Sequence, residues 1–143
     1  MRVPTYLLKT EPDDYSYDDL VRDTSTIWDG VATPPACQIM REVRKGDEAF
    51  IYHTGKEKRI AGLCKVISDP YPDPKRTDLT AKGDVKFPVF DVKKHKASKH
   101  VVTLAEIKAD NRFSDFPLVT MGRLSAMLVP PKLDKAIRTM CGL

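Results

Sequence analysis

Short apolar runs separated by turn-forming residues dominate the sequence and predict a fold rich in β-strands. Tyr6–Leu8 is an apolar run that ends in polar residues, and it predicts a first strand. The β-rich segments Glu48–Thr54 and Arg59–Asp69 flank Gly55 and predict a hairpin. Gly62, inside the second of these segments, indicates a bulge or a close backbone approach.

The second half of the chain predicts three more strands around one long loop. The strands are expected at Lys86–Lys94, His100–Val102 and Leu124–Val129. Pro70–Asp84 is rich in proline and polar residues, which predicts a loop, and loops of this length are often functional. In the first half, Ile27–Val31 is too short for a helix and ends next to a glycine.

Capping residues and prolines predict four short helices between these strands. They are expected to begin at Ser16, at Pro34-Pro35, at Thr103 and at Pro131, with the third ending near Asn111 and the fourth at Gly142. Strands and short helices in this order predict an α+β fold, a small mixed β-barrel of five to six strands with peripheral helices. Regular alternation of strands with long helices is missing, which argues against a doubly wound sheet. The 143 residues fit a single domain, expected over residues 1–143.

The chain is mildly basic, with a formal net charge of +4 at pH 7. This balance is compatible with a polyanionic partner but does not require one. Four lysines and two histidines lie within the eight residues Lys93–His100. Two interpretations stay open: a solvated hairpin tip or edge strand, whose lysines discourage aggregation, or a phosphate-binding patch. The three cysteines, far apart in the sequence, are expected to be reduced and buried: Cys37, Cys64 and Cys141.

The sequence contains no motif that demands catalysis. Metal-ligand spacings, a phosphate-cradling glycine loop and a nucleophile elbow are all missing, so we expect no catalytic residue, metal or other cofactor. His53 follows Tyr52 on a predicted strand and is either a base or binding residue or, more commonly for such a position, a hydrogen-bonded structural histidine. No segment approaches the roughly 20 apolar residues of a membrane span. Met1–Thr5 lacks a signal-peptide pattern, so we expect a cytoplasmic protein without membrane contact.

Several blocks of the sequence resemble EVE domains. The opening Tyr6-Leu7-Leu8-Lys9-Thr10-Glu11-Pro12-Asp13-Asp14-Tyr15-Ser16 is the first of them. Further blocks follow in family order at Trp28–Val31, Phe50–Glu57, Ile60–Leu63, Tyr71–Pro74, Phe90–Val92, Thr103–Lys108 and Arg123–Ser125. The resemblance covers nearly the whole chain. EVE domains are similar to PUA and YTH domains, so the resemblance implies a PUA-like β-barrel with helices around it.

The resemblance also implies a function. EVE domains are thought to read modified DNA bases, so the expected activity is non-enzymatic binding of nucleic acid, DNA rather than RNA, by a monomer. A methylated or hydroxymethylated base would lie in an aromatic pocket with Trp28 as one wall. The residues expected around the base are Lys9, Thr10, Trp28, Gly30, Val31, Tyr52, His53 and Phe87, and those expected near the nucleic-acid backbone are Arg123, Lys93, Lys94 and Lys56.

Physical chemistry limits what one aromatic contact achieves. A base removed from its stack regains about 1–3 kcal/mol by lying on an aromatic face. A methyl group adds only about 1 kcal/mol through buried apolar area, so recognition of a modified base needs a tight and dry cage. Trp28 is the only tryptophan, and an isolated tryptophan is often simply a core residue. The family context favours the pocket.

The chain departs from the usual EVE sequence at three places. Ala32–Gln38 reads Ala-Thr-Pro-Pro-Ala-Cys-Gln where family members usually carry Arg-Asn-Tyr-Gln-Ala-Arg-Asn. Phe87 stands where a tryptophan is usual, and Met121-Gly122 where Gln-Ser is usual. Two alternatives therefore stay beside the base reader. One is an interaction module with a diverged pocket, and the other is a small-molecule or nucleotide pocket with weak hydrolytic activity from His53 and Asp29.

Overall fold

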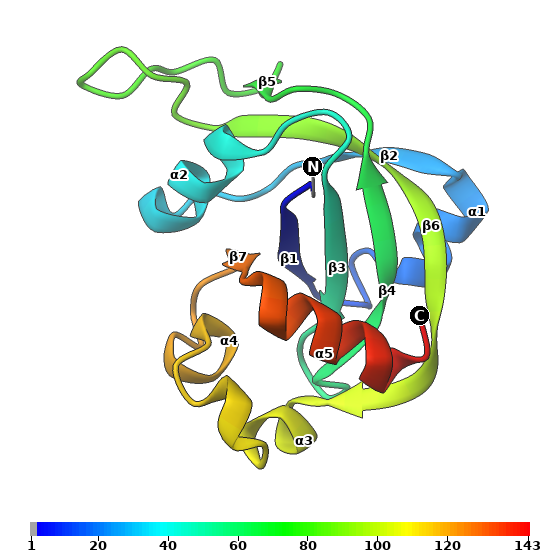
Figure 1. Cartoon of the computed structure of the whole chain (residues 1–143). Helices are drawn as coiled ribbons and strands as arrows, with labels where there is room; N and C mark the ends of the chain where they lie inside the picture. Colours follow the sequence, from blue (N-terminus) through cyan, green and yellow to red (C-terminus); the bar gives the residue numbers. More distant parts are fainter. Residues whose placement is uncertain (1–2) are drawn as a thin grey trace.

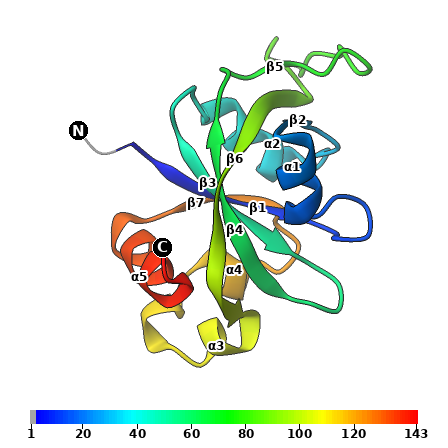
Figure 2. The same ribbon diagram turned by 90° about the vertical axis from the view of Figure 1, so that its right-hand side faces the viewer.

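A strongly curved mixed sheet of seven strands forms the centre of the molecule (Figures 1 and 2). The computed structural model describes residues 3–143, so the first two residues of the predicted domain lie outside the description. The strands are β1 (Thr5–Thr10), β2 (Ser25–Trp28), β3 (Glu48–His53), β4 (Arg59–Val66), β5 (Tyr71–Pro72), β6 (Pro88–Thr103) and β7 (Ala126–Val129). Neighbouring strands follow the order β2-β6-β4-β3-β1-β7, and β5 pairs with β6. The pair β1–β3 is parallel, and the other described pairs are antiparallel.

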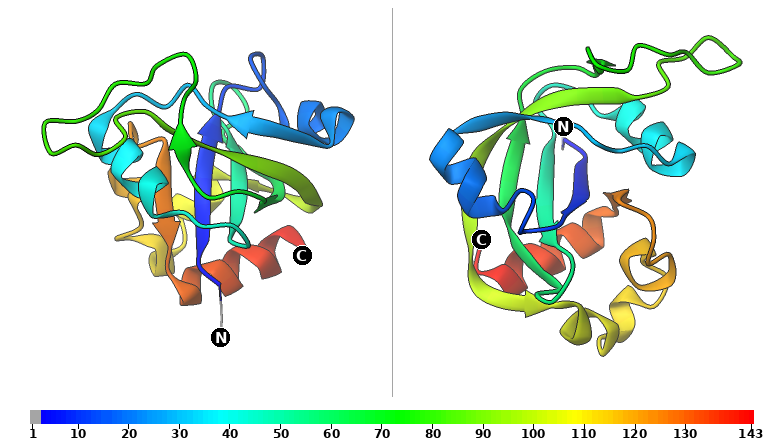
Figure 3. Two further views of the ribbon diagram at one scale, coloured as in Figure 1. Left: turned by 90° about the horizontal axis from the view of Figure 1, so that it is seen from above. Right: turned by 180° about the vertical axis from the view of Figure 1, so that it is seen from behind.

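The sheet curls toward a barrel but does not close, because none of the pairings within residues 3–143 joins β2 to β7. The terminal strands β2 and β7 have four residues each. Helix α2 (Pro34–Glu42) contacts both β6 and β7 near this opening (Figure 3), so a helix rather than a strand ladder covers the gap. The predicted α+β class is confirmed. The sheet has seven strands where five to six were predicted, and it curves as a small barrel does without closing.

Strand β6 is continuous over 16 residues, where the sequence predicts two strands with a turn between them. It pairs with β4 between Val92 and Thr103 and with β2 between Phe90 and Lys93. Two register shifts in its pairing with β4 bend the ladder, as bulges do. The hairpin-tip interpretation of Lys93–His100 is therefore wrong. Beyond Lys93, the second edge of β6 has no strand partner among the described residues, which fits the edge-strand interpretation of these lysines.

Gly62 confirms one of the two alternatives drawn from the sequence. The register of β4 shifts between Ile60 and Gly62, which is the predicted bulge. A β-carbon at Gly62 would also lie 2.6 Å from Cε1 of the Tyr17 ring, so the group that approaches the glycine is a side chain and not the expected backbone. Tyr17 is fixed there because its hydroxyl donates to the Leu63 carbonyl at 2.8 Å and accepts from the backbone N–H of His95 at 3.3 Å. The glycine thus makes room for a buried tyrosine that ties the first helix to two strands.

Short helices surround the sheet, with α1 and α2 toward the end that carries β2 and α3, α4 and α5 toward the opposite end (Figure 1). Their bounds are α1 (Tyr17–Asp23), α2 (Pro34–Glu42), α3 (Leu104–Lys108), a 3-10 turn η1 (Asn111–Phe113), α4 (Pro117–Thr120) and α5 (Pro131–Cys141). The four predicted helices are confirmed. Helix α4 and η1 were not predicted, because each is a single turn that proline or aspartate starts without any apolar periodicity.

The N-terminus of α1 forms a reciprocal capping box. The Ser16 hydroxyl accepts from the Asp19 backbone N–H at 3.0 Å, and the Asp19 carboxylate accepts from the Ser16 N–H at 2.9 Å. The hydrogen bond from the Ser16 backbone and the nearby Arg22 guanidinium hold the pKa of Asp19 below its usual value. Two otherwise unpaired backbone donors are satisfied, which is why a serine and an acid suffice to start this helix.

Replacing Ser16 with alanine is expected to lower the free energy of unfolding by about 1 kcal/mol, because the Asp19 N–H loses its acceptor. Thermal unfolding should then occur about 3–5 °C lower. Thr33→Ala is the matched control, since Thr33 occupies the N-cap of α2 without a side-chain capping bond. Equal melting temperatures for wild type and Ser16→Ala would contradict the capping role.

Alternation along the strands places buried side chains on two faces of the sheet. Leu8 and Ile51 join the apolar cluster that also holds Trp28 and residues of α1 and α2. Leu7 and Tyr52 belong to a second cluster with residues of α3, α4 and α5. The three cysteines are buried and free, as the sequence predicts: Cys37, Cys64 and Cys141. Burial raises the pKa of Cys64 to about 12, so this thiol stays protonated and inert.

Candidate functional site

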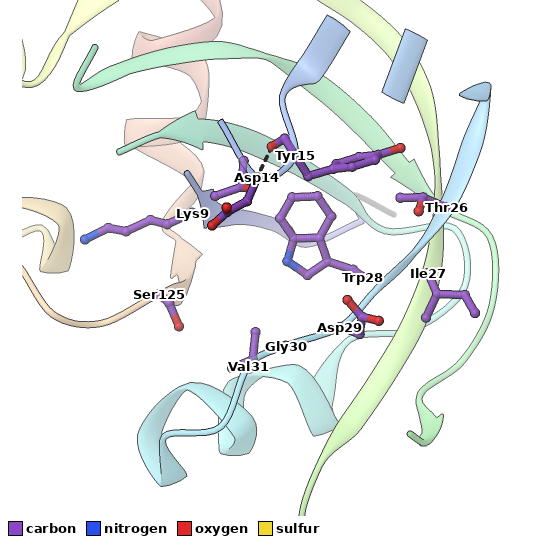
Figure 4. A pocket seen from close by; sticks show the side chains of 11 residues that line it. Lys9, Asp14, Tyr15, Thr26, Ile27, Trp28, Asp29, Gly30, Val31 and Ser125 are labelled. Atoms are coloured by element: carbon purple, nitrogen blue, oxygen red, sulfur yellow. Dashed lines mark hydrogen bonds between the residues drawn. The ribbon is translucent and has the colours of Figure 1, made fainter. Parts of the chain in front are cut away.

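A cavity of about 650 Å³ lies between β2 and the residue that precedes β7 (Figure 4). We call it the Trp28 cavity. Its walls come from β2, from the end of β1 with the loop that follows, and from the residue before β7. Its volume falls within the range of roughly 300–1,000 Å³ that is typical of small-molecule sites. Five residues predicted to contact a base line this cavity: Lys9, Thr10, Trp28, Gly30 and Val31.

Trp28 is both a core residue and a wall of the cavity. Its side chain packs in the first apolar cluster and the residue is only 6% exposed, while its strand position pairs with Phe90. The indole N–H makes no hydrogen bond with a described residue. Every fully buried polar side-chain atom of the described residues does have a partner, so the indole nitrogen is not fully buried. The nitrogen is therefore reachable from the cavity, and Figure 4 shows it on the side that Ser125 borders. The packed ring is a rigid wall that offers one hydrogen-bond donor.

Tyr15 forms the wall beside Trp28 (Figure 4). The Thr10 hydroxyl donates to the Tyr15 carbonyl at 2.7 Å, and the Tyr15 hydroxyl donates to the Asp23 carboxylate at 2.9 Å. Burial raises the pKa of Tyr15, so the phenol stays neutral and keeps this bond. Hydrogen bonds thus hold both the backbone and the hydroxyl of Tyr15, so its ring forms a second aromatic wall in a fixed position.

Charged groups at the Trp28 cavity are arranged on different sides. Figure 4 shows the Asp29 carboxylate beside Trp28 and the Lys9 side chain extending away from it. The carboxylates of Asp14 and Asp29 make no hydrogen bond or ion pair with a described residue and are free to accept one from a ligand. The Lys9 ammonium donates to the Gly122 carbonyl at 2.9 Å, and burial lowers its pKa. The cavity therefore favours a neutral ligand with donor groups over an anion.

Gly30 carries the chain around the lower edge of the cavity. Its φ of +81° lies in the left-handed region, which glycine adopts without strain. A side chain at this position would meet no atom within 4 Å, so the requirement is conformational rather than steric. The turn brings Val31 back against the first apolar cluster, where it is 8% exposed and lines the cavity.

Three of the predicted base contacts do not line the Trp28 cavity. Tyr52 belongs to the apolar cluster on the opposite face of the sheet, where the Lys9 ammonium lies 5.8 Å from its ring centre. Phe87 lies under the Arg76 guanidinium, 4.2 Å from its ring centre, so one aromatic face is already covered. His53 is buried and also lies outside the cavity.

Both ring nitrogens of His53 serve the fold. Its Nε2 accepts from the Tyr17 backbone N–H at 3.0 Å, and its Nδ1 lies 3.0 Å from the Glu57 carboxylate. Because Nε2 accepts, Nδ1 carries the proton and donates it to Glu57. The hydrogen bond from His53 holds the pKa of Glu57 below its usual value. The interpretation as a hydrogen-bonded structural histidine is confirmed in its geometry.

The four cations predicted near a nucleic-acid backbone come from separate parts of the surface. Lys56 lies in the turn between β3 and β4, and Lys93 and Lys94 lie on β6. Arg123 lies in the loop before β7 and is exposed, without a hydrogen bond or ion pair to any described residue. Of the four, Arg123 is nearest in sequence to a residue of the Trp28 cavity, because Ser125, two positions later, lines that cavity.

Six residues of the Trp28 cavity were not predicted as base contacts: Asp14, Tyr15, Thr26, Ile27, Asp29 and Ser125. Thr26 precedes Trp28 by two residues on β2, so strand alternation places both on one face. That signal was hidden because a four-residue strand is too short to show a period. Asp14 and Tyr15 belong to the opening block that resembles EVE domains, but the resemblance assigned neither of them a contact with the base.

The fold and the cavity define a PUA-like α+β protein. The structure of an ASCH protein from Zymomonas mobilis has the same fold, with a TM-score of 0.58 at 13% identity over 95% of this chain and 94% of that chain. More specifically, the chain belongs to the EVE domain family, whose pattern matches residues 5–140. The family assignment drawn from the sequence is confirmed.

The chain is similar to a curated protein and to several solved structures. Human thymocyte nuclear protein 1 is 32% identical over 124 residues, which cover 73% of this chain and 55% of the human protein. The chain thus spans about half the length of this relative. A solution structure from Rhodopseudomonas palustris is 37% identical, covers 98% of this chain and 94% of that chain, and has a TM-score of 0.86. Human THYN1 in complex with DNA containing 5-methylcytosine is 26% identical, covers 95% and 96%, and has a TM-score of 0.84.

The described residues contain neither a helix that could span a membrane nor a group of side chains that could bind a metal. No helix within residues 3–143 is long and apolar enough to cross a membrane. No group of three or more histidine, cysteine, aspartate and glutamate side chains in that range could hold a metal ion.

Proposed function

We propose that this chain binds DNA by holding one modified cytosine, methylated or hydroxymethylated, in the Trp28 cavity without catalysing a reaction. The observation that carries the proposal is a free donor and a free acceptor at one cavity, the Trp28 indole N–H and the Asp29 carboxylate. The likeness to human THYN1, found in complex with DNA containing 5-methylcytosine, supports this choice of ligand.

A base must leave the helical stack to enter such a cavity, and the walls compensate for part of that loss. Stacking energy lost on extrusion amounts to a few kcal/mol. Trp28 and Tyr15 supply two aromatic walls that are held by packing and hydrogen bonds. The indole N–H donates to an acceptor atom of the base, and Asp29 accepts from the exocyclic amino group, as acidic side chains do toward cytosine. The methyl group gains about 0.8 kcal/mol by contact with apolar atoms such as those of Val31.

The phosphates of the strand lie outside the cavity in this arrangement. Asp14 and Asp29 repel them from its interior, whereas Arg123 offers an unpaired guanidinium beside it. Lys9 adds a second positive charge next to Gly122. Few phosphate contacts predict a modest dependence of affinity on salt.

The hydrolytic alternative lacks its base. His53 is 4% exposed, uses both ring nitrogens within the fold and does not line the cavity that contains Asp29. A general base must reach the proton that it abstracts, directly or through one water. The geometry therefore favours binding over hydrolysis, and no specific contact favours the interaction-module alternative.

Trp28→Phe is the variant that tests the proposal, because it keeps a packed ring and removes the N–H. Matched oligonucleotides that carry one cytosine, 5-methylcytosine or 5-hydroxymethylcytosine would be titrated by fluorescence anisotropy. The wild type is expected to prefer a modified strand, and Trp28→Phe to bind that strand about 2- to 10-fold more weakly through the loss of one hydrogen bond.

Phe87→Leu is the control, because Phe87 was also predicted to stack on a base but lies outside the Trp28 cavity. This variant should keep the wild-type preference. If wild type and Trp28→Phe bind all three strands equally, the cavity is not a base-binding site.

A further inference from the structure

A second hollow of about 430 Å³ lies beside the Trp28 cavity, and we call it the Met121 hollow. It is bordered by the start of α2 and by the loop before β7, through Thr33, Pro35, Met121, Gly122, Arg123 and Leu124. Most of these side chains are apolar. Met121 is 50% exposed, so a large apolar side chain faces solvent at this point.

One short loop, residues 121–125, contributes lining residues to both cavities. Leu124 lines the Met121 hollow and its neighbour Ser125 lines the Trp28 cavity. Lys9 fastens this segment twice: its backbone N–H donates to the Ser125 carbonyl at 2.9 Å, and its ammonium donates to the Gly122 carbonyl at 2.9 Å. These two bonds hold the end of β1 against the loop whose residues line both cavities.

The start of α2 makes the Met121 hollow unsuitable for a phosphate group. Pro34 and Pro35 occupy the first two positions of the helix and have no N–H to donate. The N-cap residue Thr33 contributes no side-chain capping bond. The available charge is Arg123, whose guanidinium has no partner among the described residues. The Met121 hollow thus offers apolar surfaces on which a flat ring could lie. It also offers one positive charge, Arg123, to an anionic group next to that ring.

Two of the three departures from the usual EVE sequence meet at this hollow. Pro34-Pro35 and Met121-Gly122 lie almost ninety positions apart in the sequence, but Pro35, Met121 and Gly122 all line it. Pro35 and Met121 thus border the same space from the start of α2 and from the loop before β7.

We infer that the Met121 hollow binds the nucleobase next to the modified cytosine on the same strand. This inference rests on the proposed function of the Trp28 cavity. The phosphate that joins the two nucleotides lies between the cavities, next to Lys9 and Arg123. Contact with Pro35 and Met121 is independent of the identity of the flanking base, because every base has an apolar π-face.

The test uses short single-stranded DNA with a central 5-methylcytosine, in which the nucleotide on its 5′ side or on its 3′ side is abasic. One of the two abasic strands is expected to bind the wild type about 5- to 50-fold more weakly than the intact strand. Met121→Gln should weaken binding of the intact strand, and the same abasic change should then have much less effect. Leu128→Gln is the matched control, since Leu128 is 47% exposed and lines neither cavity.

Free 5-methyldeoxycytidine separates the two claims. Its binding, followed by NMR, depends on the Trp28 cavity alone and should be equal in wild type and Met121→Gln. The Met121 methyl signal should move when the intact strand binds and should not move with the nucleoside. If the nucleoside binds but both abasic strands bind like the intact one, the hollow is no base subsite and the proposed function stands. If neither the nucleoside nor the modified strand binds, the proposed function itself fails.

Discussion

Replacing Gly62 with alanine is expected to lower the free energy of unfolding by about 3 kcal/mol, at the upper end of what overpacking usually costs. The added β-carbon would lie 2.6 Å from Cε1 and Cζ of the Tyr17 ring, well inside contact distance. The ring cannot move away cheaply, because Tyr17 is 3% exposed and its hydroxyl is bonded to the Leu63 carbonyl and the His95 N–H. Thermal unfolding should occur about 10 °C lower, as measured by calorimetry or circular dichroism.

Gly122→Ala is the control for this substitution. Its β-carbon would meet no atom within 4 Å, and its backbone does not require glycine. This variant should be neutral or slightly more stable, because alanine restricts the unfolded chain. Combining Gly62→Ala with Tyr17→Leu should cost less than the two separate effects added together. A melting temperature for Gly62→Ala within 1 °C of the wild type would contradict the close approach.

Asp29→Ala is expected to lower the discrimination between 5-methylcytosine and thymine by about 5- to 150-fold, the equivalent of 1–3 kcal/mol. Both bases carry the same methyl group. With that group in the same place, thymine presents a carbonyl oxygen to the carboxylate where cytosine presents an amino group. Asp29 has no competing hydrogen bond or ion pair with a described residue, so its carboxylate is available to make this distinction.

The ratio of the two dissociation constants is the quantity to measure. Removing any acidic side chain near a polyanion raises affinity for every strand, which would mask a change in one affinity alone. Asp13→Ala controls for this effect, because Asp13 is exposed in the same loop as Asp14 but does not line the Trp28 cavity. A ratio unchanged in Asp29→Ala would show that Asp29 does not read the amino group.

Local signals in the sequence predicted much of the fold. Ser16 with Asp19, and Thr103 with Glu106, each start the helix that their capping chemistry indicates. Gly62 marked the bulge in β4, whereas the side chain of Tyr17 that packs against it was not predicted. The continuity of β6 was not predicted, because its lysine-rich middle looks like a turn unless the pairing with β4 is known. Long-range pairing, rather than local preference, keeps that segment extended.

The candidate site was harder to predict, since it depends on which face each strand presents. Trp28 and Tyr52 are both aromatic residues on strands, but they belong to apolar clusters on opposite faces of the sheet. A shift of one residue in strand register exchanges the faces, and the sequence alone does not fix that choice. The placement of Phe87 depends on Arg76, which covers its ring from the preceding loop. Neither the sheet face of each aromatic residue nor the contact between Arg76 and Phe87 can be predicted from the sequence alone.

No ladder of backbone hydrogen bonds joins β2 to β7 among the described residues, which has a consequence for the width of the Trp28 cavity. In a complete barrel, ladder hydrogen bonds fix the spacing of neighbouring strands at about 4.8 Å. Here, the contacts of α2 with β6 and β7 take the place of such a ladder among the described residues, and packed side chains set the spacing instead. A ligand that touches Trp28 on one side and Ser125 on the other mechanically couples the two ends of the sheet. Its contacts thus bridge two strands that no backbone ladder joins among the described residues.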